Sequence, residues 1–229
     1  MKLGSSSSTL CATLLTFVLV TFCCIGYLLL AYVVFTKVPP GANRAHVDET
    51  INGPTVMTTT GRVEGVRISR LGKHVDAFLG IPYASSPTGE LRFSRPEPVP
   101  KWKGVYRAHR QPPACMQFTS NAIELPWSIK DLEQSETDCL RLNVWAPVTS
   151  KVNASRPVMI WIHGGGFVSG HISSPEFDGS ALASYTDTVV AMMNYRVGVF
   201  GFLNLNHPDI EGNMGMYDQV TTFRKEWNV

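Results

Sequence analysis

A glycine triplet is the part of this sequence that most directly suggests chemistry. Gly164, Gly165 and Gly166 follow one another, directly after His163. Because glycine has no Cβ, the backbone can turn sharply here and point successive N–H groups at one spot, which then attracts an oxyanion. Three glycines taken alone also fit an ordinary flexible turn. Their position at the end of the apolar run 158–162 favours the anion-binding interpretation.

Two apolar runs must hold this loop in place. Residues 158–162 and 188–193 contain no charged side chain, which is typical of strands buried on both faces of a sheet. The segment 175–184 between them can form a helix. A strand, a helix and a strand in this order predict a parallel pair within an α/β sheet. Residues 215–227 predict the start of another helix.

The preceding residues predict antiparallel strands instead. β-branched and polar residues alternate over 56–60 and 61–69, and 75–81 is a third short run. The many prolines between 82 and 113 exclude a long helix there. A further short strand is expected at 142–146, where an apolar run ends at a proline.

The N-terminal region carries a long apolar segment. Of the 26 residues from 10 to 35, 22 are apolar and none is charged. As a helix this segment would span about 39 Å, enough to cross a hydrocarbon core of about 30 Å. A cleaved signal peptide would have a shorter apolar region of about 7–15 residues. We therefore expect a short tail at 1–9, a transmembrane signal anchor at 10–35, a linker at 36–54 and a globular domain at 55–229.

The side of the membrane on which the domain lies is less directly indicated. Lys2 precedes the apolar segment while Lys37 and Arg44 follow it, so the count of basic residues is nearly balanced. Asn153 begins an Asn-Ala-Ser glycosylation sequon. This sequon, together with the cysteine distribution, indicates a single-pass membrane protein with an extracellular or luminal domain.

Two cysteines form the whole complement of the globular part. Cys115 and Cys139 would be bridged in an oxidising compartment, and the closed loop would stabilise the fold by roughly 3–4 kcal/mol. The other three, Cys11, Cys23 and Cys24, lie in the apolar segment, where they pack as small apolar residues or accept a palmitoyl group.

Composition excludes several classes of protein. The 20 basic and 18 acidic residues nearly balance, so nothing indicates a nucleic-acid partner. An apolar content of 44% with 17% charged residues excludes a disordered chain. The six histidines show no ligand spacing, so we expect no metal and no cofactor.

Several motifs accompany the glycine loop, and in combination they resemble the type-B carboxylesterase and cholinesterase family of α/β-hydrolases over residues 56–224. The motifs are Gly80-Ile81-Pro82-Tyr83-Ala84, Leu91-Arg92-Phe93, Arg95-Pro96-Glu97-Pro98, Asp138-Cys139-Leu140, Leu142-Asn143-Val144-Trp145-Ala146-Pro147, His163 to Phe167, Asn194-Tyr195-Arg196-Val197-Gly198, Gly212-Asn213-Met214-Gly215 and Asp218-Gln219.

The resemblance implies both a fold and an activity. The fold would be the N-terminal part of an α/β-hydrolase, an incomplete and mostly parallel central sheet. The activity would be hydrolysis of carboxylic esters through an acyl-enzyme. Gly165 and Gly166 would donate two N–H groups to the oxyanion hole, and Gly164 would support the loop. The resemblance also implies a disulfide between Cys115 and Cys139.

No nucleophile elbow of the form G-x-S-x-G occurs in the sequence. In this family the elbow, the acid and the catalytic histidine all follow the glycine loop. Residues 166–170 look similar, but Ser169 is in the wrong position. We therefore expect the N-terminal portion of a longer serine hydrolase, truncated before the elbow and inactive as given. The alternative is a non-catalytic adhesion or receptor protein of the same fold, similar to neurotactin and the neuroligins, with a protein partner.

Two positions depart from the family pattern. An additional residue before Cys139 shifts Glu136 by one place from its position in the family. The sequence therefore does not decide whether Glu136 forms an ion pair with Arg92. Arg141 replaces the aromatic residue or threonine that the family has there, which an exposed strand face would tolerate.

Overall fold

The computed structural model describes residues 46–47, 53–118, 132–148, 155–207 and 210–224. The chain divides into two compact units, 1–44 and 45–229, and all described residues belong to the second. The expected membrane anchor at 10–35 and the sequon at Asn153 lie outside the described residues. Among the residues that are described, no helix combines the length and apolar character needed to cross a bilayer.

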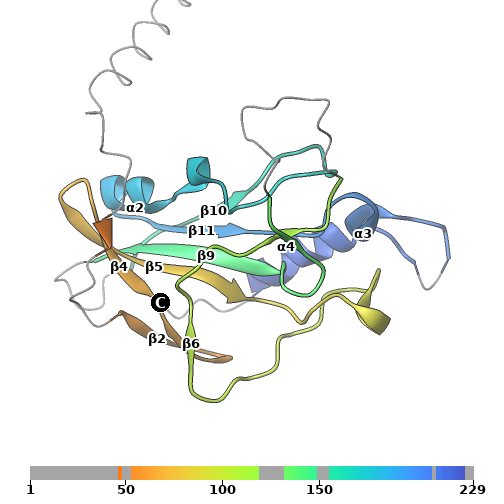
Figure 1. The fold of residues 1–229 in the computed structure, drawn as a ribbon, viewed down its shortest axis with the longest axis horizontal. Coiled ribbons are helices and arrows are strands. Elements are labelled where there is room, and N and C mark those ends of the chain that lie inside the picture. Colours follow the sequence, from red (N-terminus) through yellow and green to blue (C-terminus); the bar gives the residue numbers. More distant parts are fainter. Residues whose placement is uncertain (1–45, 48–52, 119–131, 149–154, 208–209, 225–229) are drawn as a thin grey trace, which may run out of the picture. The chain divides into compact units, whose positions relative to one another are not determined.

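A six-stranded sheet forms the centre of the described part (Figure 1). Neighbouring strands are paired in the order β1, β4, β5, β9, β11, β10. Their bounds are His46–Val47 for β1, Val66–Arg70 for β4, Lys73–Pro82 for β5, Arg141–Pro147 for β9, Val189–Met193 for β11 and Val158–Ile162 for β10. Strand β1 thus lies within the segment 36–54 that the sequence predicts to be a linker, and it pairs with β4.

The expected parallel pair is confirmed, but the expectation of a mostly parallel sheet is wrong for these strands. β10 and β11 are parallel, joined through the helix α2 (Ser180–Thr186). The pairs β1–β4, β4–β5, β5–β9 and β9–β11 are all antiparallel. The reason is the connection: a parallel neighbour needs a crossover, whereas β4 and β5 are joined by the short turn Leu71-Gly72.

Strand β11 lies between two apolar clusters. Ala191 and Met193 belong to one cluster with Leu142 and Val144 of β9. Val190 belongs to the other, together with Trp145, Ile172 and Ala183. Successive side chains of a strand point to opposite faces, so β11 is buried on both, as its apolar run predicts.

Strand β10 does not share this burial, although its sequence predicts it. Val158, Met159, Trp161 and Ile162 are 37–47% exposed. The cause is topological, because β10 pairs with β11 on one side and is the last strand of the sheet in the described part.

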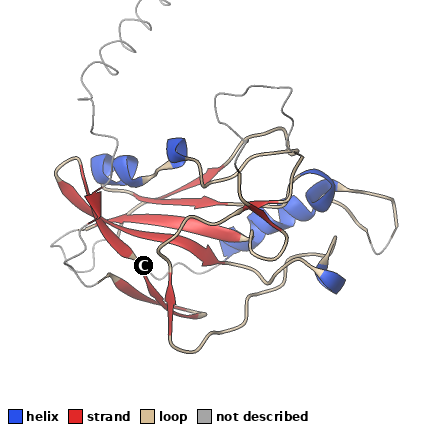
Figure 2. Cartoon of the chain, in the orientation of Figure 1, coloured by secondary structure: helices blue, strands red, loops and turns tan. Residues whose placement is uncertain are grey.

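Smaller elements surround the main sheet (Figure 2). Three strands form a second sheet in the order β2, β3, β6, with β3 antiparallel to β2 and parallel to β6. Strands β7 and β8 form a parallel pair. Helix α2 packs on β5, β9 and β11, and α3 packs on α4. The bounds are Thr55–Thr58 for β2, Gly61–Glu64 for β3, Val105–Arg107 for β6, Ala114–Cys115 for β7, Gln134–Ser135 for β8, Gly89–Leu91 for η1, Pro175–Phe177 for η2, Gly198–Phe202 for α3 and Met214–Arg224 for α4.

A buried ion pair connects the end of β11 to α4. The Asp218 carboxylate accepts hydrogen bonds from the backbone N–H of Arg196 (3.0 Å) and from its Nε (2.9 Å) and Nη2 (2.8 Å). The two side chains are 0% and 3% exposed. Burial raises the pKa of Asp218, and the hydrogen bonds and charge of Arg196 oppose that shift. Breaking such a pair leaves an uncompensated charge in the core.

We therefore predict that Asp218→Asn lowers the free energy of unfolding by about 3–5 kcal/mol, because Arg196 would stay buried without its counter-charge. Urea denaturation followed by tryptophan fluorescence measures this change. The control is Glu211→Gln, which removes the exposed partner of Arg95 and should leave the transition nearly where it is. Equal, small shifts for both variants would contradict the prediction.

Candidate functional site

The glycine loop leaves the sheet at the carboxyl end of β10. Ile162 and Met193 are the last paired residues of β10 and β11, so the segments that follow the two parallel strands emerge at the same edge. In open α/β sheets this edge is where ligand sites form. The segments are joined directly, since the N–H of Gly198 donates to the carbonyl of Phe167 (2.7 Å).

The glycines differ in what the backbone requires of them. Gly165 and Gly166 have φ angles of +127° and +60°, which favour glycine. A Cβ at Gly165 would overlap the carbonyl of Ser169, whereas one at Gly164 would meet nothing within 4 Å. The carbonyl of Gly165 accepts the N–H groups of Val168 and Ser169, both at 3.1 Å. A tight turn therefore centres on Gly165.

Two N–H groups of this turn are open to a ligand. Gly165 and Gly166 are exposed. Within the described residues, neither N–H donates to an acceptor, in contrast to those of Val168, Ser169 and Gly170. Unpaired donors at an exposed turn are available to a ligand oxygen.

His163 packs beneath the loop. Its ring stacks on Tyr195 with centroids 4.3 Å apart, its Nδ1 lies 3.0 Å from the Gly164 carbonyl, and its own carbonyl accepts the Tyr195 hydroxyl (3.0 Å). Burial lowers the pKa of His163 from 6.5 to about 4. The histidine is therefore neutral at physiological pH and is well placed to shape the loop.

Gln117 anchors the far end of the loop, a role that sequence reasoning missed. Its Nε2 donates to the Gly170 carbonyl (3.0 Å), and its Oε1 accepts the Gly170 N–H (2.8 Å). Gln117 lies two residues after Cys115, which forms the expected disulfide with Cys139 (Cα–Cα 4.8 Å). The proximity to this cysteine in sequence is the signal that could have drawn attention to it.

The two departures from the family pattern have different outcomes. Glu136 does pair with Arg92, at 2.6 Å between Nη2 and Oε2, despite the shift of one residue. The expectation that Arg141 lies on an exposed strand face is wrong. Its side chain is 18% exposed, donates to the Gly80 carbonyl (3.1 Å), and contacts Tyr106 Oη and Asp138. Burial lowers the pKa of Arg141.

Ser169 is not placed as a nucleophile. Its hydroxyl lies 3.4 Å from the Gly165 carbonyl. In the described part of the chain no imidazole bonds to it, since His163 Nδ1 meets Gly164 and His171 Nδ1 accepts the N–H of Ser173. A serine without a base remains a weak nucleophile.

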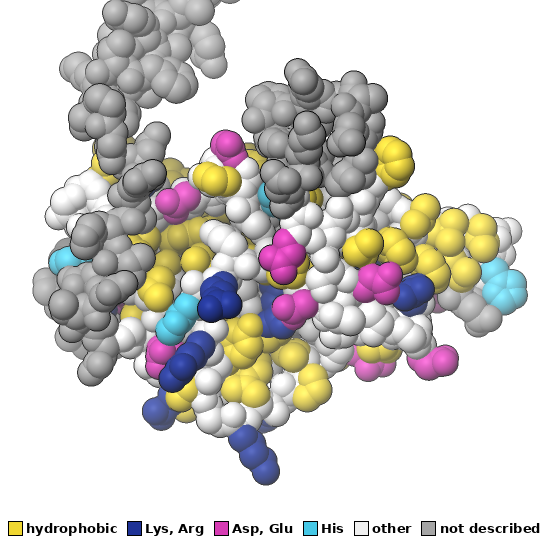
Figure 3. Space-filling model, viewed as in Figure 1, with side chains coloured by type: hydrophobic (Ala, Val, Ile, Leu, Met, Phe, Trp, Pro, Cys, Tyr) yellow, Lys and Arg dark blue, Asp and Glu magenta, His cyan; other side chains and the backbone are white. Residues whose placement is uncertain are grey.

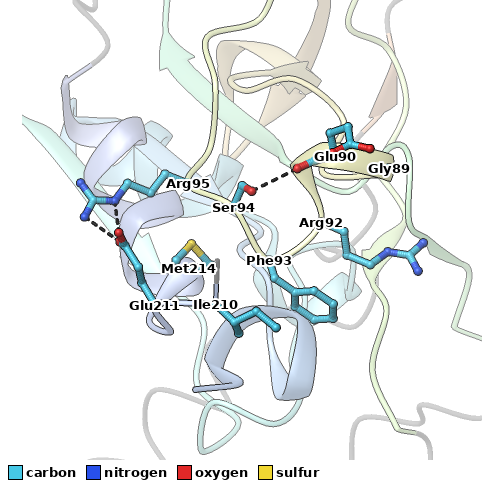
Figure 4. A pocket seen from close by; sticks show the side chains of 9 residues that line it. All are labelled: Gly89, Glu90, Arg92, Phe93, Ser94, Arg95, Ile210, Glu211 and Met214. Atoms are coloured by element: carbon cyan, nitrogen blue, oxygen red, sulfur yellow. Dashed lines mark hydrogen bonds and ion pairs between the residues drawn. The ribbon is translucent and has the colours of Figure 1, made fainter. Parts of the chain in front are cut away.

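A cavity of about 630 Å³ lies elsewhere, between η1 and the start of α4 (Figure 4). Arg95 on one wall donates two hydrogen bonds to Glu211 on the other, at 3.1 and 2.8 Å. Phe93 stacks on Phe200 at 6.0 Å. The glycine loop does not line this cavity, and its basic and acidic walls already neutralise each other.

Comparisons with known proteins show the family to which the chain belongs. Residues 52–224 match the carboxylesterase family. The chain is 45% identical over 171 residues to acetylcholinesterase-1 of Trittame loki, 43% over 182 residues to the cholinesterase of Mus musculus, and 43% over 186 residues to carboxylesterase 3B of Mus musculus. The alignments cover 73%, 77% and 76% of this chain. The chain therefore belongs to the carboxylesterase family, whose fold is the α/β-hydrolase fold with mixed sheets.

The chain spans about a third of the length of these relatives. The same alignments cover 30%, 29% and 32% of the three proteins. The residues that match the family model, 52–224, include the glycine loop, Cys115, Cys139, Arg196 and Asp218.

The lowered pKa of His163 gives a prediction for stability against pH. In the unfolded chain the His163 ring takes up a proton below about pH 6.5, whereas in the folded chain it does so only near pH 4. The contribution of the neutral ring to stability is therefore complete above pH 6.5 and is lost as the pH falls. The loss from this residue amounts to about 3 kcal/mol between pH 7 and 4.

The variant His163→Phe keeps a ring against Tyr195 but does not titrate. Urea denaturation of both proteins at pH 7 and pH 4 should show the larger loss of stability in the wild type. Parallel losses in the two proteins would refute this role for His163.

Proposed function

We propose that this chain provides the oxyanion-binding part of a serine hydrolase that acts on carboxylic esters. Gly165 and Gly166 would hold the oxyanion of the tetrahedral intermediate with their N–H groups, while Gly164 extends the loop. The single observation that carries the proposal is the pair of exposed N–H groups without an acceptor among the described residues. Donors already fixed in a turn need no reorganisation when charge develops on the substrate.

The chain by itself is proposed to be inactive. The sequence holds no G-x-S-x-G elbow, and oxyanion donors without nucleophile, base and acid have nothing to attack an ester. The edge of β10 that has no partner among the described strands supports this, because a further strand could pair there and bring a nucleophile beside the glycine loop. The names of the relatives, cholinesterases and carboxylesterases, support an ester as substrate.

We further propose that residues 10–35 anchor the protein in a membrane, with the globular domain on the extracellular or luminal side. The apolar run supports the anchor. The Cys115–Cys139 disulfide supports the oxidising side of the membrane, where the sequon at Asn153 would be glycosylated.

A chimera tests the oxyanion proposal. Residues 52–224 replace the matching segment of mouse cholinesterase, and hydrolysis of p-nitrophenyl acetate is measured. The chimera should be active. Gly165→Ala should then reduce kcat by about 100- to 1,000-fold. The new Cβ would clash with the Ser169 carbonyl, so the backbone of the loop would shift and its N–H donors would move away from the oxyanion.

The matched control is Gly72→Ala, since Gly72 also has a positive φ (+74°) but open space around it and lies in the β4–β5 turn. It should leave kcat close to that of the parent chimera. An active chimera that tolerates Gly165→Ala would refute the role of the loop.

The sequence of the transcript beyond the codon for Arg224 distinguishes the hydrolase proposal from the adhesion alternative. An elbow serine followed by an acid and a histidine supports the hydrolase. A complete downstream domain in which that serine is replaced would overturn it in favour of a non-catalytic receptor.

A further inference from the structure

Basic side chains gather around the small sheet. In Figure 3 the Lys and Arg side chains concentrate over the region where Figure 1 draws β2 and β6. Arg62 of β3 pairs in register with Val105 of β6, and Glu64 with Arg107, so these four side chains share one face of the sheet. Arg62, Val105 and Arg107 are exposed there.

Two lysines extend this face. Lys101 and Lys103 flank Trp102, whose Nε1 donates to the carbonyl of Arg62 (2.9 Å) and whose ring lies against Tyr106. The tryptophan therefore holds the backbone of residues 101–103 beside β3 and β6. Both lysines are exposed.

A cleft of about 600 Å³ opens next to this face. Arg107, Arg110 and Arg141 line it together with His109 and Tyr106. Its acidic lining residues are Glu133 and Asp138. Arg141 is held rigidly in the wall by the Gly80 carbonyl, Tyr106 and Asp138. This is the arginine that departs from the family pattern.

The charge of the region is unbalanced. The face and the cleft together hold six of the chain's 20 basic residues. They hold only three of its 18 acidic residues, which are Glu64, Glu133 and Asp138. The six are Arg62, Lys101, Lys103, Arg107, Arg110 and Arg141. Of these, Arg141 pairs with Asp138 and Arg107 lies 3.9 Å from Glu64. For the other four, no ion pair with a carboxylate is formed inside the described ranges.

We propose that the basic face formed by Arg62, Lys101 and Lys103, together with the adjoining cleft lined by Arg107, Arg110 and Arg141, binds a sulfated polysaccharide. Arginine presents a planar fork of donors that suits tetrahedral and planar oxyanions. The volume of the cleft admits sugar units, which a flat bilayer surface could not fill. The disulfide matches the oxidising side of the membrane, where sulfated polysaccharides lie. This site is separate from the proposed glycine loop and goes beyond the ester-hydrolysing function.

The test uses the full chain in a neutral detergent micelle. Binding of a fluorescent heparin octasaccharide is followed by anisotropy at several salt concentrations. Binding should weaken steeply with salt, and the double variant Arg107→Gln/Arg110→Gln should weaken it by at least about tenfold, since each cation lost removes a counter-ion contact. Both side chains are exposed, so the variant should fold.

The matched control is Lys73→Gln/Arg95→Gln, which removes two exposed cations outside the cleft and should bind the octasaccharide like the wild type. Arg141→Thr restores a family-type residue and should also weaken binding. Three results would each overturn the proposal: no saturable binding of heparin, equal binding by the Arg107/Arg110 variant, or equal affinity for an unsulfated hyaluronan oligosaccharide.

Two further probes exclude other polyanions. Phosphatidylserine vesicles and a single-stranded oligonucleotide of equal charge should compete poorly for the octasaccharide. Competition by either one as effective as by unlabelled heparin would overturn the sulfated sugar in favour of an anionic membrane or a nucleic acid.

Discussion

The buried pair of Arg196 and Asp218 is the interaction on which the geometry of this domain depends. It joins the segment that follows β11 to helix α4. Its three hydrogen bonds use the backbone as well as the side chain of Arg196. The segment that it fixes also carries Gly198, whose N–H holds the carbonyl of Phe167. A buried charge pair therefore helps to determine where the glycine loop lies.

Asn194 extends the same constraint to other parts of the chain. Its side chain accepts the N–H of Ile172 and donates to the carbonyl of Pro113, and its own carbonyl accepts the hydroxyl of Tyr83. Burial, followed by the charge of Asp218, raises the pKa of Tyr83 well above 10, so the phenol remains a donor. Segments distant in sequence thus meet through satisfied polar groups at the end of the sheet. Such networks favour one arrangement, because partly satisfied alternatives are costly.

Sequence patterns predicted the features that depend on residues close together in the chain. They failed where burial or strand pairing depends on residues that are distant in the sequence. The apolar run of β11 and the intervening helix were enough to predict a parallel pair. The same type of run could not show that, among the described strands, β10 has a partner on one side only. Glu136 still reaches Arg92 because long side chains absorb a shift of one residue. Arg141 is partly buried through its contacts with Tyr106 and Gly80, residues that are distant in the sequence and that no local pattern contains.

In the described part of the chain one edge of β10 has no partner strand, and this has a consequence for the life of the chain in a cell. No charged gatekeeper residue lies between 158 and 162, and an uncovered apolar edge of this kind is a template for strands of other molecules. As long as the edge stays uncovered, chaperones that hold extended apolar segments compete with aggregation for it. In that state the abundance of the protein would depend on how fast the edge is covered as well as on the stability of the folded core.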